Sequence, residues 1–474
     1  MKRIAIIGGG ISGLTAAFTL EQRRRAGASL DYVVYESSPR LGGVLVTDHI
    51  DGCVVEAGPD SFLTEKPWAA DLCRQVGQGD QLIGSNDADR KTYILVKGKL
   101  VVIPDGLMFM VPTKILPTVF SPLFSLGTKL RMAREWFHPP RKGEADETVA
   151  SMVERHYGSE MVDRLADPLL SGVYGGEASQ LSVRAVLPRF ADMEARHGSL
   201  GRAMLSARRK MPAPASPRPL FTSLRDGMQR LVDAVVAQLS AAALRTGTPV
   251  SSVRPESGGW LVSAGYQSDH FDAAIVATPA PAAATVLQTA SPGLASELGA
   301  IPYTSSVTVN LAYNDNVRSS LPPGFGFLVP RSEGKQMLAA TFVHNKFPHR
   351  APENRALVRC FMGGARNEQI LQAPDEQIVL RVREELRQII GLTAEPQFTR
   401  VYKWRGAMAQ YGVGHLERLE RIERLCRQLP GLALAGNGYR GIGVPDCVRS
   451  GADAAAQVLT ALGVAPSESR AASS

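Results

Sequence analysis

A glycine-rich turn near the amino terminus most constrains what this chain can fold into. The apolar run Ile4 to Ile7 predicts a buried strand, and Gly8, Gly10 and Gly13 follow it with the spacing G-x-G-x-x-G. A helical pattern comes next, and a second strand over 31–35 completes a βαβ unit. Parallel strands joined by helices form sheets that are covered on both faces. The sequence therefore predicts an α/β fold.

The spacing gives each residue of this turn a physical role in holding a dinucleotide. Gly8 permits a tight turn, Gly10 lets the backbone approach a pyrophosphate, and Gly13 lets the helix pack closely on the strand. Ile11 and Ser12 open the helix, whose free N–H groups and positive dipole end favour phosphates. The motif alone is weak evidence, but here it stands between a predicted strand and a predicted helix.

An acidic residue and a second glycine pair indicate which dinucleotide is bound. Glu36 ends the second strand, 23 residues beyond Gly13, where it can accept hydrogen bonds from ribose hydroxyls. The Arg-x-Gly-Gly run formed by Arg40, Gly42 and Gly43 resembles the second fingerprint of the FAD-dependent amine oxidase superfamily. Its glycines let more backbone pass the pyrophosphate and the flavin, and Arg40 supplies positive charge. We therefore expect FAD rather than NAD.

A third strand agrees with a domain of this type. Residues 273–278 form a predicted strand that ends at Thr278, close to the expected position of the adenosine half of the cofactor. Val253, on an earlier predicted strand, is placed to meet the adenine through its backbone.

Five further stretches make the resemblance more specific. In chain order they are 58-GPDSFLTEKP-67, 112-PTKI-115, 168-PLLSGVYGGE-177, 410-QYGVGH-415 and 441-GIGVPDC-447. Together they resemble the oxygen-dependent porphyrinogen oxidases of haem biosynthesis, which act on protoporphyrinogen or coproporphyrinogen III. The resemblance implies an FAD-dependent oxidase that removes six electrons from a porphyrinogen, passes them to O2 and releases hydrogen peroxide.

The resemblance also assigns residues to the two ligands. Flavin N5 carries the chemistry, with no catalytic side chain and no metal. Lys66 is expected to bind a propionate and Gly172 to line the substrate side; the plain alternatives are a surface lysine and a turn glycine. Further residues expected at the cofactor are Gly58, Pro59, Asp60, Trp404, Gly436, Gly441, Ile442, Gly443 and Val444; for Trp404 the plain alternative is an ordinary core tryptophan.

His415 is a candidate for acid–base catalysis. It lacks an identifiable carboxylate or nucleophile partner in the sequence, so we expect it to be structural.

The stretch 436-GNGYRGIGVPDC-447 repeats the glycine spacing of the amino terminus. Only 33 residues follow Gly441, too few for another βαβ unit, and no acid stands at a following strand end. We expect instead a strand over 432–435, a glycine turn, and a helix beginning near Pro445 and Asp446. In the resembling family this helix start faces the pyrimidine end of the flavin.

The same resemblance implies three interleaved parts. They are a Rossmann-like FAD-binding domain (1–70, 218–290 and 398–465), a mixed-sheet substrate-binding domain (71–90, 185–217 and 291–397) and a helical subdomain that contacts membrane (91–184). A flexible tail is expected to follow them (466–474). Within the helical part, the apolar segment 106–127 contains three prolines, so we expect short helices there.

Composition limits the location and the partners of the protein. Five cysteines without C-x-x-C spacing indicate reduced thiols, and no segment reaches the roughly 18 apolar residues of a membrane span. We therefore expect a cytoplasmic protein. The net charge of +8 is spread over short clusters, which argues against nucleic acid. Peripheral contact with the inner face of the membrane and hand-off of the porphyrin to a ferrochelatase are implied by the resemblance alone.

Two kinds of rival function share parts of this pattern. One is another oxidase of the superfamily; an amine oxidase needs an aromatic cage, whereas the C-terminal stretch shows only Tyr439, and stretches 58–67 and 168–177 oppose a carotenoid desaturase. The other is a non-enzymatic escort protein, which would not need the complete set of glycines with Glu36. The sequence leaves open which porphyrinogen is preferred and the oligomeric state.

Overall fold

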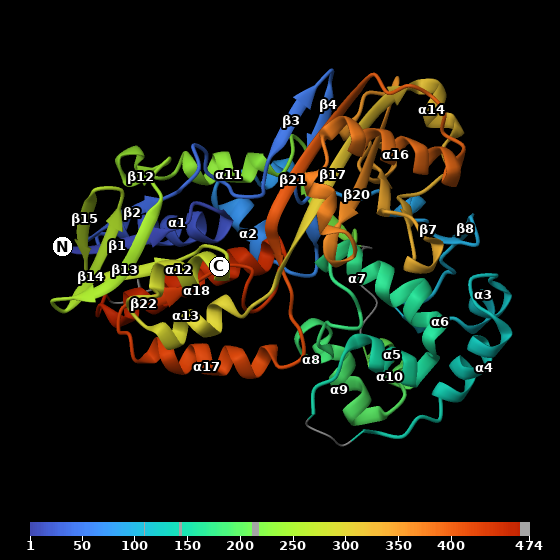
Figure 1. Cartoon of the computed structure of the whole chain (residues 1–474), viewed down its shortest axis with the longest axis horizontal. Helices are drawn as coiled ribbons and strands as arrows, with labels where there is room; N and C mark the ends of the chain where they lie inside the picture. The colour runs from blue at the N-terminus through green and yellow to red at the C-terminus, as the bar shows by residue number, and fades with distance from the viewer. Residues whose placement is uncertain (109, 142–144, 211–217, 465–474) are drawn as a thin grey trace, which may run out of the picture.

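The computed structural model describes the chain apart from residues 109, 142–144, 211–217 and 465–474 (Figure 1). The expected tail at 466–474 lies outside the described residues, and so do residues 212–217 of the stretch 212-PAPASPRP-219, which the sequence predicts to be a linker or an exposed loop. Two sheet-based parts follow one another along the long axis, and a group of helices lies beside the second (Figure 1). Within the described ranges, every helix is too short or too polar to cross a membrane.

A five-stranded parallel sheet carries the glycine turn of the amino terminus. Its order is β12-β2-β1-β16-β22, and all neighbouring pairs are parallel. Strand β2 lies on one side of β1 and β16 on the other, so the strand order reverses direction at β1, and the crevice at its carboxyl end is where such a sheet binds ligands. The α/β prediction is confirmed. The strands are Lys2–Ile7 (β1), Leu30–Tyr35 (β2), Leu244–Arg245 (β12), Ala273–Val276 (β16) and Leu432–Leu434 (β22).

Both faces of this sheet are buried. Ile4 and Ile6 pack into one core, and Ala5 and Ile7 into another, because successive side chains of a strand point to opposite faces. The first core is covered by α1 (Ile11–Arg25), α2 (Trp68–Gln75), α11 (Gln229–Val236) and α18 (Val444–Ala461). The second is covered by α12 (Ala280–Leu287), α13 (Pro292–Gly299), α17 (His415–Arg427) and the antiparallel strands β13 (Val250–Glu256), β14 (Gly259–Ala264) and β15 (Gln267–Phe271).

The helical periodicity of residues 228–244 predicts a single amphipathic helix, but the observed helix α11 is shorter. It ends at Val236, and the chain then returns as the edge strand β12. Leu244 and Arg245 pair with Val34 and Tyr35 of β2. Hydrogen bonding to a distant strand therefore overrides the helical periodicity of this segment.

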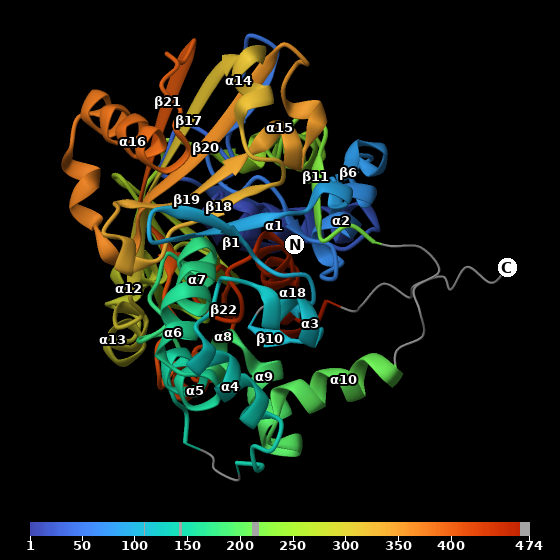
Figure 2. The ribbon, with the colours of Figure 1, turned by 90° about the vertical axis from the view of Figure 1, so that its right-hand side faces the viewer.

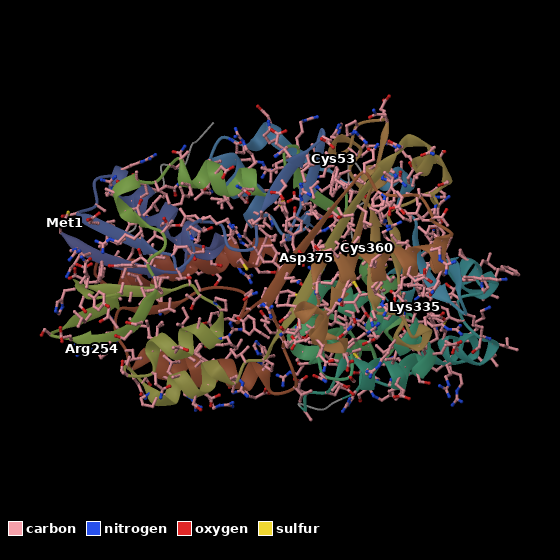
Figure 3. All side chains as sticks on the ribbon, turned by 45° about the horizontal axis from the view of Figure 1, so that its top comes forward. Met1, Cys53, Arg254, Lys335, Cys360 and Asp375 are labelled. Carbon is pink, nitrogen blue, oxygen red and sulfur yellow. The ribbon has the colours of Figure 1, made fainter. Side chains whose placement is uncertain are left out.

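A seven-stranded sheet forms the second part, in the order β21-β17-β20-β19-β18-β7-β8. Helix α16 (Asp375–Ile390) packs on one face, in the core that contains Cys360 (Figure 3). The strands are Thr92–Val96 (β7), Lys99–Val102 (β8), Tyr303–Asn314 (β17), Gly326–Leu328 (β18), Met337–Phe342 (β19), Arg355–Gly363 (β20) and Phe398–Ala409 (β21).

Two segments pair with this sheet although the expected domain limits place them elsewhere. The hairpin β7–β8 was grouped with the helical part, but β7 pairs with β18. Strand β21 was grouped with the FAD-binding domain, but it pairs with β17. Sheet hydrogen bonds join residues far apart in sequence, which local patterns do not reveal. The other limits stay a prediction.

Smaller strands connect the two sheets. A hairpin joins β3 (Thr47–Ile50) to β4 (Cys53–Glu56), and a three-stranded sheet has the order β5-β11-β6. Its strands are Phe62–Leu63 (β5), Leu82–Gly84 (β6) and Phe221–Leu224 (β11).

Short helices make up the third part, and those within 106–127 agree with the prediction from its prolines. Helices α9 and α10 also belong to this part, although the expected limits place 185–217 in the substrate-binding domain. Figure 2 shows α7 against the sheet and α4, α5, α9 and α10 farther from it. The segment 106–127 differs from the expectation in opening with a strand pair, β9 (Leu107–Met108) and β10 (Val111–Pro112), before its helices. The helices are Ile115–Phe120 (α3), Leu126–Glu135 (α4), Val149–Tyr157 (α5), Ser159–Met161 (α6), Asp167–Tyr174 (α7), Val183–Val186 (α8), Pro188–His197 (α9) and Leu200–Lys210 (α10).

A buried ion cluster holds several of these helices together. His156 of α5 lies 3.1 Å from Glu135 of α4 and 3.0 Å from Glu194 of α9. Burial works to lower the pKa of His156, but its hydrogen bonds to the two glutamates outweigh burial and raise that pKa. His138, His156 and Glu194 could in principle bind a metal ion, because one ring nitrogen of each histidine and a carboxylate oxygen of the glutamate lie within 4.8 Å of one another. Arg155 also pairs with Glu194, so ion pairs account for this geometry and we assign no metal to it.

Candidate functional site

The first glycine turn leaves one space open. Gly8 has a φ of +109°, and a Cβ there would lie 2.7 Å from the carbonyl oxygen of Ala277. A Cβ on Gly13 would lie 1.9 Å from the carbonyl oxygen of Gly8, so packing excludes side chains at both positions. At Gly10, by contrast, no described atom beyond its chain neighbours lies within 4 Å of a Cβ position. That space fits a pyrophosphate, which is the group this turn is predicted to hold.

The start of α1 supplies donors to the same space. Gly10 is its N-cap, and no side chain caps the helix, so the N–H groups of the first turn are free to bind an anion. Helix α18 lies directly against this end of α1: a Cβ on Gly451 would lie 2.1 Å from the carbonyl oxygen of Ser12.

The ends of the two strands beside β1 bring further predicted residues to this edge. Glu36 follows β2, and its carboxylate accepts hydrogen bonds from the N–H groups of Gly9 at 2.7 Å and Ser38 at 2.8 Å. Thr278 follows β16 on the other side. Val253 of β13 is fully buried, in the core that also contains Tyr35 and Val276, the last residues of β2 and β16.

The second glycine turn lies against the first. The N–H of Gly42 donates to the carbonyl oxygen of Gly9 at 2.8 Å. Gly42 and Gly43 have φ values of +104° and +59°, which favour glycine. The guanidinium of Arg40 donates to the carbonyl oxygen of Gly43 and so closes the turn. The two fingerprints of the sequence therefore meet at one edge of the parallel sheet.

Residues 57–60 cross from this edge to one face of the seven-stranded sheet. Trp404 of β21 donates through Nε1 to the carbonyl oxygen of Ala57 at 2.8 Å, and Arg359 of β20 donates to that of Gly58. Asp60 forms an ion pair with Lys346 at 3.0 Å. Burial works to raise the pKa of Asp60, but Lys346 and Arg359 outweigh it and hold the pKa well below its ordinary value. Asp60 therefore stays ionised and fastens this segment to the sheet.

The turn at 436–444 lies at the same edge of the parallel sheet, because it follows β22, which runs parallel to its neighbour β16. Gly436 and Gly441 have φ values of +127° and +111°, and a Cβ on Gly441 would lie 2.4 Å from Cγ of Asp446. Gly443 is the N-cap of α18, which begins at Val444 without a side-chain cap. The predicted order of strand, glycine turn and helix is confirmed, and this turn belongs to the same sheet as the first.

The plain alternatives for the two predicted substrate residues do not hold, since Lys66 is not a free surface lysine and Gly172 does not lie in a turn. Lys66 is not a freely solvated lysine: its Nζ lies 2.6 Å from Oδ2 of Asp446, a side chain that is 4% exposed. Gly172 is not a turn glycine, because it lies within α7. It is exposed, and the nearest neighbour to a Cβ there is Leu328 at 3.8 Å.

Sequence reasoning did not identify several side chains that meet these segments. Lys346 and Arg359 contact residues 58–60, and Tyr303 and Tyr411 contact the turn at 436–444. Only Tyr411 lies in a stretch that carries the resemblance. The structural interpretation of His415 agrees with its buried hydrogen bond to the carbonyl oxygen of Tyr439.

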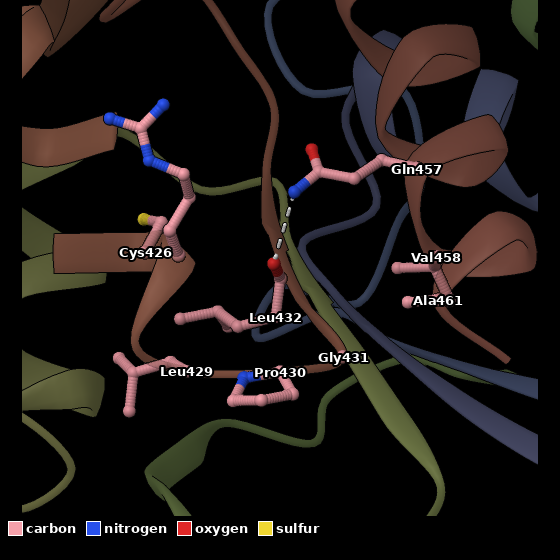
Figure 4. Close-up of a pocket in the computed structure, with 9 residues that line it drawn as sticks. Cys426, Leu429, Pro430, Gly431, Leu432, Gln457, Val458 and Ala461 are labelled. Carbon is pink, nitrogen blue, oxygen red and sulfur yellow. Dashed lines mark hydrogen bonds between the residues drawn. The ribbon is translucent and has the colours of Figure 1, made fainter. Parts of the chain in front are cut away.

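A surface cavity lies at the opposite edge of the parallel sheet (Figure 4). Gln457 donates there to the carbonyl oxygen of Leu432 at 3.5 Å. Because β22 begins at Leu432, the cavity is at the amino edge, whereas ligands of parallel sheets bind at the carboxyl edge. We therefore do not assign the cofactor to it. Its lining residues are Cys426, Arg427, Leu429, Pro430, Gly431, Leu432, Gln457, Val458 and Ala461.

Comparisons with curated proteins agree with this geometry. The coproporphyrinogen III oxidase of Bacillus subtilis (strain 168) is 34% identical, with 97% of this chain and 98% of that protein covered. The coproporphyrinogen III oxidase of Propionibacterium freudenreichii is 32% identical, with 98% and 92% covered. The mitochondrial protoporphyrinogen oxidase of Nicotiana tabacum is 28% identical, with 97% and 95% covered.

Solved structures share the whole fold. A protein of Exiguobacterium sp. 255-15, provisionally assigned as a protoporphyrinogen oxidase, superposes with a TM-score of 0.87 at 29% identity over 98% of this chain and 99% of that one. Cyclohexylamine oxidase from Brevibacterium oxydans IH-35A has a TM-score of 0.69 at 19% identity, over 98% and 99%, which shows the fold alone.

A family model supplies the last observation. Residues 11–459 match the model of the flavin containing amine oxidoreductases, a span that begins at the first residue of α1 and includes the turn at 436–444 and the whole seven-stranded sheet. The chain therefore belongs to the flavin containing amine oxidoreductase family, and it is an oxidoreductase with FAD as its cofactor.

Proposed function

We propose that this protein oxidises a porphyrinogen to the porphyrin in haem biosynthesis, with O2 as the electron acceptor and hydrogen peroxide as the second product. The observation that carries the proposal is the likeness to a coproporphyrinogen III oxidase over 97% of the chain. The open space at Gly10, which fits a pyrophosphate, supports an enzyme that retains its cofactor and weighs against an escort protein.

Coproporphyrinogen III is the substrate that we favour. Relatives at 34% and 32% identity carry the name coproporphyrinogen III oxidase, whereas two plant protoporphyrinogen oxidases are 28% identical. An amine or a carotenoid as substrate has weaker support, because the amine oxidase with the same fold is 19% identical.

In this proposal the chain's own residues hold the cofactor in two places. Gly10 and the start of α1 would hold the pyrophosphate, and the carboxylate of Glu36 would accept hydrogen bonds from the ribose hydroxyls. The turn at 436–444 and the uncapped start of α18 lie against the ring, where their N–H groups stabilise negative charge. The flavin, when bound, supplies the two-electron redox chemistry.

The substrate side lies between α7 and Lys66. Gly172 leaves an exposed, unobstructed surface on α7, next to the exposed apolar side chain of Val173. Lys66 is one-third exposed and has three N–H donors, of which Asp446 accepts one. The remaining donors are available to a propionate of the substrate.

A fluorescence assay tests the proposed reaction directly. Porphyrinogens are nearly non-fluorescent and porphyrins emit red light, so the FAD-loaded protein in air should speed the appearance of red fluorescence and release peroxide. Coproporphyrinogen III should react faster than protoporphyrinogen. No acceleration with either substrate would contradict the proposal, and a faster reaction of protoporphyrinogen would reverse the preference.

Gly10→Val tests the position of the cofactor. A Cβ at this position has no described atom within 4 Å beyond its chain neighbours, so the unfolding temperature of the cofactor-free protein should be nearly unchanged. It should fill the pyrophosphate space and abolish FAD binding, as measured by the flavin content after purification and by titration with FAD. Gly13→Val is the matched contrast, because its side chain would strike the carbonyl of Gly8 and should destabilise even the cofactor-free protein. Normal FAD content in Gly10→Val would contradict the placement.

Lys66→Ala should raise the KM for the porphyrinogen about tenfold, equivalent to ~1.4 kcal/mol of binding, with FAD content unchanged. It should also lower the unfolding temperature, because Asp446 loses its close cation. The double variant Lys66→Met with Asp446→Asn separates these effects: it should regain stability and keep the high KM. A wild-type KM in both variants would remove Lys66 from the substrate site.

We also propose that the cytoplasmic protein touches the inner face of the membrane through α3 and α4, and passes its poorly soluble product to a ferrochelatase. Exposed apolar side chains, three on α3 and two on α4, form what we call the apolar patch: Leu116, Val119, Phe120, Leu126 and Leu130. Lys129, Arg131 and Arg134 lie on α4 with Leu126 and Leu130, and their positive charge suits anionic lipids.

Flotation with vesicles of phosphatidylcholine and phosphatidylglycerol measures this membrane contact. Leu126→Glu with Leu130→Glu should lose it, whereas Leu380→Glu, an exposed leucine on α16, should not; wild-type protein that never floats would contradict it.

A further inference from the structure

The proposed function gives no role to the stretch 410–415. Its side chains form hydrogen bonds with the glycine turn that precedes α18. The phenol of Tyr411 donates to the carbonyl oxygen of Asn437 at 2.6 Å and accepts from the N–H of Gly441 at 2.9 Å. One hydroxyl therefore joins the two ends of the turn at 437–441. Tyr411 is 1% exposed, so its hydroxyl is shielded from bulk water although both hydrogen bonds are only partly buried.

His415 holds the middle of the same turn. Its Nε2 donates to the carbonyl oxygen of Tyr439 at 2.9 Å, and its ring stacks on that of Tyr411 with 4.1 Å between centroids. Burial lowers the pKa of His415, so the ring is neutral and acts here as a simple donor. The backbone of the turn is thus held at three alternate residues by a single stacked pair.

A second phenol holds the turn from the other side. Tyr303, which opens β17, donates to Oδ1 of Asn437 at 3.1 Å and accepts from the N–H of Ala280 at 3.0 Å. Nδ2 of Asn437 donates to the carbonyl oxygen of Ala407 in β21 at 2.8 Å. Because Ala280 opens α12 just after Thr278, Tyr303 ties together the segments that follow β16 and β22.

Both phenols must be protonated to donate and accept at the same time. Burial raises the pKa of Tyr303 to about 12 and that of Tyr411 well above its ordinary value, so both are neutral. A phenylalanine at 411 would keep the stacked ring but remove the two hydrogen bonds to the turn.

The same segment reaches the substrate side. Nε2 of Gln410 donates to the carbonyl oxygen of Tyr174 at 2.6 Å, and the ring of Tyr411 meets that of Tyr174 edge-on with 6.2 Å between centroids. Tyr174 is the last residue of α7, the helix that carries Gly172. Residues 410 and 411 therefore lie between the helix beside the substrate and the turn beside the flavin.

We propose that Tyr411 is a positioning residue for the flavin: supported by His415 and Tyr303, it sets the turn at 437–441, and with it the start of α18, against the ring. This inference rests on the cofactor placement of the proposed function. Its test uses no porphyrinogen, so the identity of the substrate can prove wrong without affecting it, and a failure here leaves the substrate assignment standing.

The test is Tyr411→Phe, with FAD affinity and flavin midpoint potential as the readouts. Titration of the cofactor-free variant with FAD, followed by flavin fluorescence, should show the Kd raised about tenfold, the loss expected when two neutral hydrogen bonds disappear. The midpoint potential of the bound flavin should become more negative, because the N–H groups at the start of α18 are no longer held against the ring. Tyr303→Phe, which loosens the turn from the other side, should change both quantities in the same direction.

Tyr157→Phe is the matched control. It removes another buried phenol by the same chemical change, but in the helical part, and the Tyr157 oxygen has no hydrogen-bond partner. Its Kd and potential should equal those of the wild type. If Tyr411→Phe and Tyr303→Phe lower only the unfolding temperature, with the wild-type Kd and potential retained, Tyr411 is structural alone and the proposal is wrong.

Discussion

The close approach of backbone to backbone around α1 is the constraint on which the rest of the structure depends. Gly13 lets α1 lie against the turn that leaves β1, and Gly451 lets α18 lie against Ser12. Any side chain at either position would push a helix away from its neighbour by more than packing tolerates. Both helices begin at the carboxyl edge of one sheet, and neither start has a side-chain cap. The two glycine motifs therefore lie at one edge of the same sheet.

A second level of organisation joins this crevice to the seven-stranded sheet. Asp60, Arg359 and Lys346 fasten the segment after β4, and Tyr303 and Tyr411 fasten the turn before α18. Ionised and polar groups that are buried this deeply are costly unless every partner is in place. These contacts hold the seven-stranded sheet in one position relative to the carboxyl edge of the parallel sheet.

Much of the first sheet was predictable, because its information is local. A run such as Ile4 to Ile7, a glycine turn and an acid at the next strand end lie within 36 residues, and each has one dominant physical explanation. The weaker predictions involve long-range pairing: the edge strand at Leu244, the hairpin that joins β18, and the addition of β21 to the second sheet. Periodicity describes how a segment buries its side chains and does not name the strand with which it pairs.

The sequence by itself determined the βαβ unit, the family and the cofactor, since these depend on residue types at short, exact spacings. It also determined that Gly436 to Val444 form a turn and a helix start rather than a second nucleotide site. Only the tertiary structure decided that Lys66 pairs with Asp446, 380 residues away, and that Tyr411 holds both ends of the turn at 437–441. The physical reason is that a hydrogen bond or an ion pair depends on distance and direction in space, and these arise only when separate elements have packed together.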